Sequence, residues 1–414
     1  MTATTRIDPP DWMGWPETAA VLSALGAGGA PVRFVGGCVR DALIGVTPED
    51  VDIATPEPPE TVMARLAAAA IRALPIGIEH GTITGVIGER RFEITTLRRD
   101  VEHFGRHARV AFVDDWQADA ERRDFTINAL FAEPDGTIHD LTGGLDDLKA
   151  GRVRFIGEAA TRIAEDYLRV LRFFRFHARF ARGAPDEAAI AACAEAAGAL
   201  ERLSAERVRG ELFRLLALPD PLAGLGPMRD CGVLAAVLPE AGGLGRIEAL
   251  LALPEESDSL VRLAALLADN NVERNMERAR SAAKRLRLSN AGAARLCRLL
   301  AGEPRLAADM DDGAILRGLY RTDPETMRDR ALLAWAASPR EAGFAGLPER
   351  IASLPVPAFP LQGADLLAAG MSPGPAVGRV LARLESLWLE DDCRPDRAAL
   401  LAHLTEMTGG NGTG

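Results

Sequence analysis

The segment RFVGGCVRDALIGVTPEDVDIAT, residues 33–55, restricts the possible folds of this chain more than any other part of it. It begins with an apolar run, VRFV, that is typical of a buried strand, and VRDALIG after the two glycines has the pattern of a helix. Gly36 and Gly37 would let backbone amides come close to an anion at the start of that helix. The segment therefore predicts a strand, a glycine turn that can hold a phosphate, and a helix.

Two aspartates follow at a spacing that suits metal binding. Asp50 and Asp52 lie in EDVDIAT, which we predict to be a second strand, so that both side chains would lie on one face of it. Magnesium prefers carboxylate oxygens, and two such ions can activate an attacking oxygen and stabilise a leaving phosphate. The chain contains neither GxxxxGK[ST] nor GxGxxG, which disfavours a P-loop or a dinucleotide-binding fold.

The rest of the chain divides into a strand-rich part and a helical part. Strand patterns such as TITGVIGERRFEITTLR and FAEPDGTIHDL all occur before residue 145, and helical patterns dominate after residue 186. A net charge of -11 argues against a generic nucleic-acid binder, although a local basic groove is compatible with it. Five scattered cysteines and the absence of a signal peptide or a membrane-length apolar run predict a cytoplasmic protein without disulfides or a membrane partner.

Two more clusters combine arginine with acidic side chains. In ERRDFTINALF, residues 121–131, cations and amides could meet a ribose or a triphosphate; the polar members are Arg122, Arg123, Asp124 and Asn128. In EDYLRVLRFFRFHARF, residues 165–180, polar side chains recur every three residues and would form a stripe beside an apolar helix face; they are Asp166, Arg169, Arg172 and Arg175. Either cluster could instead be a solvated surface.

Together these segments resemble the motifs of the class II tRNA nucleotidyltransferases, a family of CCA-adding enzymes and bacterial poly(A) polymerases within the polymerase-β-like nucleotidyltransferase superfamily. Later segments, among them LSAERVRGELFRLL and RLRLSN, resemble the helical part of the same family, so the resemblance covers nearly the whole chain. It implies an α+β protein with an all-α second part: a nucleotidyltransferase head at 20–150, a neck with base recognition at 151–245, and a tRNA-binding body and tail at 246–414.

The resemblance also implies roles for individual residues. Asp50 and Asp52 match the catalytic carboxylates that bind Mg²⁺, and Glu93 is a candidate third acid. The positions that match contacts to the incoming nucleotide are Gly36, Gly37, Arg40, Arg123, Arg172 and Arg175. Asp166 and Arg169 match a pair that reads the base in place of a nucleic-acid template.

The chemistry of the bases supports that last assignment. Cytosine and adenine each present an amino donor beside a ring-nitrogen acceptor, whereas uracil and guanine present a carbonyl beside an N–H. A carboxylate and a guanidinium one helical turn apart can accept from the amino group and donate to the ring nitrogen. With a wrong base the same groups would stay unpaired, which supports discrimination of about 10⁴. Asp166 and Arg169 therefore suit C and A.

The implied activity is transfer of CMP, CMP and AMP from CTP and ATP to the 3′ end of tRNA, with Mg²⁺ as cofactor. Residues 96–121 match, in position and length, the flexible loop of full CCA-adding enzymes. The alternatives within the family are a poly(A) polymerase and an enzyme that adds only CC or only A. A catalytically inactive tRNA-binding protein would be expected to lack Asp50 or Asp52, and a small-molecule nucleotidyltransferase would leave the long helical part without a role.

Overall fold

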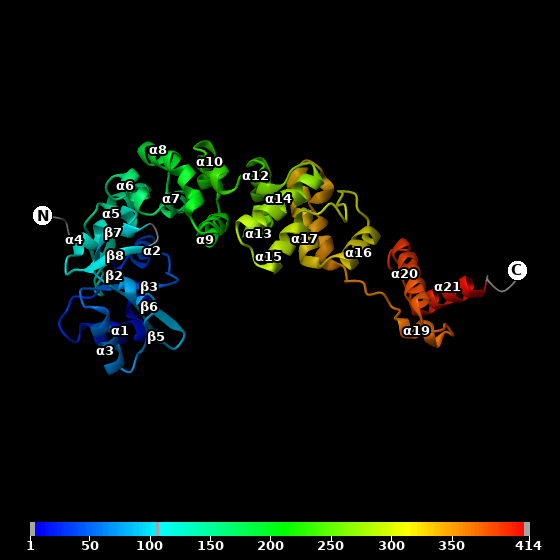
Figure 1. The fold of residues 1–414 in the computed structure, drawn as a ribbon, viewed down its shortest axis with the longest axis horizontal. Coiled ribbons are helices and arrows are strands. Elements are labelled where there is room, and N and C mark those ends of the chain that lie inside the picture. The colour runs from blue at the N-terminus through cyan, green and yellow to red at the C-terminus, as the bar shows by residue number, and fades with distance from the viewer. Residues whose placement is uncertain (1–4, 105–106, 410–414) are drawn as a thin grey trace. The chain divides into compact units, whose positions relative to one another are not determined.

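The computed structural model describes residues 5–104 and 107–409 and forms two compact units (Figure 1). The first unit ends at Pro239 and the second begins at Glu240. The further division of the first unit into a head and a neck stays a prediction. Within the described residues, no helix has the length and apolarity needed to cross a membrane.

The first unit is built on a mixed eight-stranded sheet. The predicted strand, glycine turn and helix are confirmed as β2 (Arg33–Val35), Gly36 and α2 (Gly37–Leu43). In spatial order the sheet contains β1 (Thr5–Arg6), β10 (Thr137–Asp140), β9 (Leu130–Ala132), β2, β3 (Val51–Thr55), β6 (Arg90–Thr96), β5 (Thr82–Ile87) and β4 (Arg72–Leu74). Strand β3 pairs antiparallel with β2 and parallel with β6, so it lies in the middle of the sheet.

The central strands β2 and β3 place successive residues in two different cores, one on each face of the sheet. Phe34 and Ile53 pack against the helices α1 (Pro16–Gly26) and α3 (Pro59–Ala68), while Val35 and Ala54 pack near α4 (Trp116–Glu121). Consecutive apolar residues, such as Phe34–Val35 and Ile53–Ala54, are typical of a strand covered on both sides. The central strands are therefore held rigidly from both faces.

The predicted loop region forms a hairpin outside the main sheet. Strands β7 (Arg98–Phe104) and β8 (His107–Phe112) pair antiparallel, with an irregularity between Asp100 and Glu102. Residues 105 and 106 lie outside the described residues. The hairpin leads directly into α4.

Helices complete the first unit and follow one another without further strands. They are α5 (Gly144–Ala150), α6 (Ala159–Glu165), α7 (Leu168–Phe180), α8 (Glu187–Ala196), α9 (Ala205–Leu216), α10 (Leu222–Asp230) and α11 (Val233–Val237). Helix α7 contacts both α9 and α10 (Figure 1). A Cβ at Gly224 of α10 would lie 2.7 Å from the Phe174 carbonyl oxygen, so glycine is needed for this close helix contact.

An aromatic cluster fixes α7 to the sheet region. The Phe125 ring lies 4.8 Å from that of Phe155 and 5.3 Å from that of Phe176, and Phe155 stacks on Phe173 at 5.5 Å between ring centroids. Such buried ring pairs stabilise by about 0.5–1.5 kcal/mol beyond the area that they bury. The apolar face of α7 therefore holds its arginines at a fixed place beside the sheet.

The second unit is entirely helical. Its helices are α12 (Gly245–Leu251), α13 (Ser259–Leu267), α14 (Val272–Arg285), α15 (Asn290–Leu300), α16 (Asp312–Arg321), α17 (Pro324–Ala337), α18 (Leu347–Ser353), α19 (Gly363–Ala368), α20 (Pro375–Glu390) and α21 (Arg397–Gly409). A separate apolar cluster around Trp388 joins the last three of them. The predicted helical second part of the chain is thus confirmed.

Candidate active site

A pocket of about 580 Å³ opens in the first unit where the β2–α2 turn, β3, the end of α4 and α7 meet. Seven arginines and three aspartates line it, together with Gly36, Gly37, Asn128 and Phe176. The charged members are Arg40, Arg98, Arg122, Arg123, Arg169, Arg172, Arg175, Asp52, Asp124 and Asp166. The chain as a whole has a net charge of -11, so the positive charge of this pocket is a local property.

The glycine turn borders the pocket. Gly36 has φ of 75°, and a Cβ there would lie 3.3 Å from Arg123 Nη1 and 3.9 Å from Asp52 Oδ2. Its amide donates to the Leu130 carbonyl at 3.0 Å and is not available to an anion. Gly36 therefore provides the positive-φ turn at the start of α2. That the two glycines let backbone amides come close to an anion stays a prediction.

Asp52 lies beside two other carboxylates. In the parallel β3–β6 register its partner is Glu93. Burial first, then the charge of Glu93, and more weakly that of Asp50, raise the pKa of Asp52 to about 7, against the opposing effect of Arg123. A cation bound here would relieve this repulsion.

The prediction that Asp50 lies on the strand is wrong. Strand β3 begins at Val51, and Asp50 is an exposed residue in a bend, where it lines a neighbouring cavity of about 600 Å³. Two features account for this: Pro48 precedes the bend, and β2 turns away at Gly36, so the chain before Val51 has no antiparallel partner. Asp50 therefore lies on a loop close enough to Asp52 to affect its charge, but it does not line the arginine pocket.

The acidic group is compatible with a divalent cation. Within the described residues, no three His, Cys, Asp or Glu side chains lie close enough together to hold a metal ion. Mg²⁺ in phosphoryl-transfer sites is typically bound by one or two carboxylates together with substrate phosphates and water. Asp52 with Asp50 or Glu93 offers such a set of oxygens, so these residues fit Mg²⁺ that is shared with a nucleotide.

Most pocket arginines are held by buried acids. Arg40 donates to Asp41 at 2.9 and 2.8 Å and to Asn128, and its guanidinium lies 4.3 Å from the centroid of the Phe180 ring. Asn128 donates in turn to Asp124 at 3.1 Å. Arg40 is therefore fixed in one orientation at the edge of the pocket.

The arginines of α7 are likewise held by buried acids. Arg172 donates to Asp124 at 2.6 Å, and Arg175 donates at 2.6 Å to Glu211, a buried acid of α9. Burial alone would raise the pKa of Asp124, but Arg172 and Asn128 hold it below its ordinary value. The pair is therefore charged near neutral pH, which gives the pocket its permanently oriented donors.

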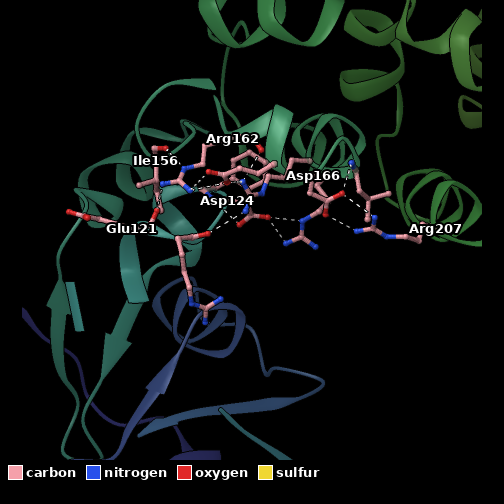
Figure 2. Close-up of polar contacts among 12 residues, drawn as sticks. Glu121, Asp124, Ile156, Arg162, Asp166 and Arg207 are labelled. Carbon is pink, nitrogen blue, oxygen red and sulfur yellow. Dashed lines mark hydrogen bonds and ion pairs between the residues drawn. The ribbon is translucent and has the colours of Figure 1, made fainter. Parts of the chain in front are cut away.

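The position of Asp166 differs from the prediction. Helix α7 starts only at Leu168, and Asp166 is the extended residue that ends α6, so it is not one turn before Arg169 on a common helix. Its carboxylate binds both terminal nitrogens of Arg207, at 3.0 and 2.7 Å, and accepts the Leu168 amide at 3.1 Å (Figure 2). The Asp166 carboxylate therefore binds the first backbone amide of α7 from the residue before its N-cap, Tyr167.

Arg169 is held by different groups. It donates to the carbonyl oxygen of Arg162 at 2.8 Å, to that of Arg122 at 3.3 Å, and to Glu165. Arg162 itself binds Glu165 at 3.0 and 2.9 Å and the Glu121 carbonyl oxygen (Figure 2). Asp166 and Arg169 thus line one pocket without pairing with each other.

Sequence analysis missed the acids and the arginine that fix this site. Arg207 and Glu211 lie in LSAERVRGELFRLL, where only a general resemblance was recognised. One signal was present: Glu211 falls between the apolar positions Val208, Leu212 and Leu215, which are buried on the same face of α9. A charge among core positions predicts a buried ion pair.

Comparison with known proteins identifies the family of this chain. Residues 32–154 match the family model described as the poly A polymerase head domain, and residues 184–242 match one described as a probable RNA and SrmB-binding site of polymerase A. The mitochondrial CCA tRNA nucleotidyltransferase 1 of Mus musculus is 34% identical over 379 residues, which cover 90% of this chain and 86% of that protein. The chain belongs to the family of CCA tRNA nucleotidyltransferases.

Bacterial members of this nucleotidyltransferase family are similar over almost their full length. The CCA-adding enzyme of Limosilactobacillus fermentum is 30% identical over 397 residues, covering 94% of this chain and 96% of that enzyme. The crystal structure of the Bacillus stearothermophilus CCA-adding enzyme in complex with CTP matches with a TM-score of 0.75 and 26% identity, covering 95% of this chain and 98% of that one. The predicted α+β fold is confirmed. Nucleotidyltransferases of this family generally use divalent metal ions.

Proposed function

We propose that this protein adds CMP, CMP and AMP to the 3′ end of tRNA, with CTP and ATP as substrates and without a nucleic-acid template. The observation that carries the proposal is the arginine-lined pocket that contains Asp52, in a chain that matches CCA-adding enzymes over 90% or more of its length. The 3′-hydroxyl oxygen would attack the α-phosphorus, and the bond to pyrophosphate would break. We propose the cytoplasm as its compartment.

Asp52 and Asp50, with Glu93 beside them, are the residues that we propose to hold Mg²⁺. When bound, the ion would lower the pKa of the attacking hydroxyl and offset the charge of the leaving pyrophosphate. The raised pKa of Asp52 supports this assignment, because crowded carboxylates at the edge of a basic pocket gain stability when a cation separates them.

The arginines would bind the triphosphate and hold its α-phosphorus in line with the attacking 3′-hydroxyl oxygen. Arg123 borders the Gly36 turn and is held by Asp119 at 2.9 Å, and Arg172 and Arg175 approach from α7. Each is oriented by a buried acid before the nucleotide arrives. Little rotamer entropy is therefore lost on binding, and positioning of this kind is the main contribution that a protein makes to phosphoryl transfer.

Asp166 and Arg169 each keep hydrogen-bonding sites that their neighbours in the protein do not use, and these sites suit cytosine and adenine. A carboxylate has about four lone pairs, and within the described residues Asp166 accepts three N–H groups, two of them on Oδ1. One acceptor site remains, on Oδ2. Of the five guanidinium N–H groups, Arg169 uses both on Nη1 and one on Nη2. These two pocket-lining side chains thus keep an acceptor and a donor for the amino group and the ring nitrogen of a base.

Two related activities remain as alternatives. A poly(A) polymerase would use the same head, and the names of both matching family models refer to polymerase A. The similarity to CCA-adding enzymes extends through both units, which favours CCA addition. An enzyme that adds only CC or only A is the second alternative, against which the match of residues 96–121 to the flexible loop of full CCA-adding enzymes speaks.

The deciding assay uses purified protein, Mg²⁺ and tRNA that lacks CCA. We expect two added nucleotides with CTP alone, none with ATP alone, and three with both. Continued addition of A in the presence of ATP alone would identify a poly(A) polymerase. Arrest after two nucleotides with CTP and ATP together would identify a CC-adding enzyme.

A further inference from the structure

A second cavity adjoins the nucleotide pocket through Asp166. It has a volume of about 390 Å³ and is lined by Ala164, Asp166, Tyr167, Arg202, Leu203, Ser204 and Arg207. Asp166 also lines the arginine pocket, so the bidentate Asp166–Arg207 pair lies at the boundary of the two (Figure 2). Cavities of this size accept a small organic ligand such as a nucleoside.

The side chains of this cavity suit a nucleobase. The Tyr167 ring is partly exposed, and the guanidinium carbon of Arg202 lies 5.9 Å from its centroid. Ser204 precedes α9 as its N-cap, yet its hydroxyl makes no capping hydrogen bond within the described residues. An aromatic face, a guanidinium plane and an uncommitted hydroxyl are the groups that bind unpaired RNA bases by stacking and edge contacts.

The reaction requires a base at such a place. The incoming nucleotide and the last nucleotide of the acceptor become neighbours in one strand, so their bases must lie side by side before the bond forms. After each addition, the new base must also leave the position between Asp166 and Arg169. An adjoining cavity that shares Asp166 satisfies both requirements.

We propose that this cavity, the acceptor-base pocket, binds the base of the terminal nucleotide of the tRNA and stacks it on Tyr167. This inference rests on the proposed function. Tyr167 is here a binding residue for the acceptor and has no part in selection of the incoming nucleotide. The base should therefore contribute to the KM for tRNA and not to the KM for CTP.

The test pairs a change in the protein with a change in the tRNA. Wild type and Tyr167→Leu are each given tRNA ending in C and the same tRNA with an abasic terminal ribose. Stacking on an aromatic side chain changes affinity by about tenfold or more, so we expect Tyr167→Leu to raise the KM for the normal tRNA about tenfold. The abasic end should do the same with wild type, and the two changes together should cost no more than either alone.

Three controls make the outcome specific. Tyr167→Phe keeps the ring and should retain the wild-type KM for tRNA. Glu201→Ala changes an exposed neighbour outside the cavity and should have no effect. The KM for CTP should stay within about twofold in every variant, since stacking concerns the acceptor.

Several results would overturn the acceptor-base pocket. If Tyr167→Leu and the abasic terminus together raised the KM for tRNA by the product of their separate effects, the base would bind elsewhere. An equal defect in Tyr167→Phe, or a rise in the KM for CTP with that for tRNA unchanged, would lead to the same conclusion. If wild type itself failed to extend tRNA lacking CCA, the proposed function would fail instead, so the two failures are distinguishable.

Discussion

Replacing Arg169 with alanine should relax the choice of base without abolishing nucleotide transfer. The change removes the donor that we assign to the ring nitrogen of cytosine or adenine, and it leaves Asp52 and the other arginines in place. A hydrogen bond to a charged group contributes about 1.5–3 kcal/mol, which corresponds to about 10- to 150-fold in rate ratio. Because the Arg169 side chain is only 12% exposed, water replaces this donor poorly. We therefore expect the preference for CTP over UTP to fall by about that factor.

The local fold should survive this change. Glu165 keeps its two bonds to Arg162, at 3.0 and 2.9 Å, when Arg169 is removed. The assay is single-turnover incorporation of each of the four NTPs into tRNA ending at the discriminator base and into tRNA ending in CC. Arg152→Ala is the matched control, because this arginine is 63% exposed and lies outside the pocket. If Arg169→Ala lowered all four rates by one common factor, this arginine would not select the base.

Three further predictions concern the metal site and the hairpin. Asp52→Ala should lower the rate of nucleotide addition by at least tenfold with tRNA affinity unchanged, since the carboxylate serves the metal and not the tRNA; a gel-shift titration beside the kinetic assay would show a different role if affinity fell in parallel. In EDTA, stability should decrease between about pH 4 and about pH 7, because the folded protein retains a proton on Asp52 (pKa about 7) that the unfolded chain (3.8) has lost. Urea unfolding across this range should show a flatter profile for Asp52→Asn, and an unchanged slope would place the proton elsewhere. Shortening residues 101–115 should spare CC addition and reduce the final A addition, because the site must accommodate a purine after pyrimidines; equal loss of both steps in the extension assay would indicate a folding defect.

The fold was predictable where local pattern and covalent geometry agree. The strand, glycine turn and helix around Gly36 follow from an apolar run and a residue that tolerates positive φ, and both are local properties. The helical second part follows in the same way from periodicity. The ends of strands were less predictable, because they depend on pairing with a neighbouring strand. Asp50 has the pattern of a strand residue, but β3 starts at Val51 because β2, its antiparallel neighbour, turns away.

The site was predictable in its members and not in their connections. Most of the side chains named from the sequence line one pocket, whereas Asp50 lines a different cavity. No local pattern indicates that Asp166 is held by Arg207, which lies 41 residues further along the chain. Long-range ion pairs of this kind depend on how helices pack, and spacing along the chain does not encode that packing.

Selection of a fixed sequence by the protein alone is best tested by sequencing the 3′ ends of the product. Purified protein, Mg²⁺ and tRNA lacking CCA are incubated with all four NTPs at equal concentration, and the added nucleotides are read from individual molecules. We expect nearly every extended tRNA to end in CCA and to stop there. Homopolymeric A tails, or U and G incorporated at frequencies near those of C and A, would contradict base selection by Asp166 and Arg169.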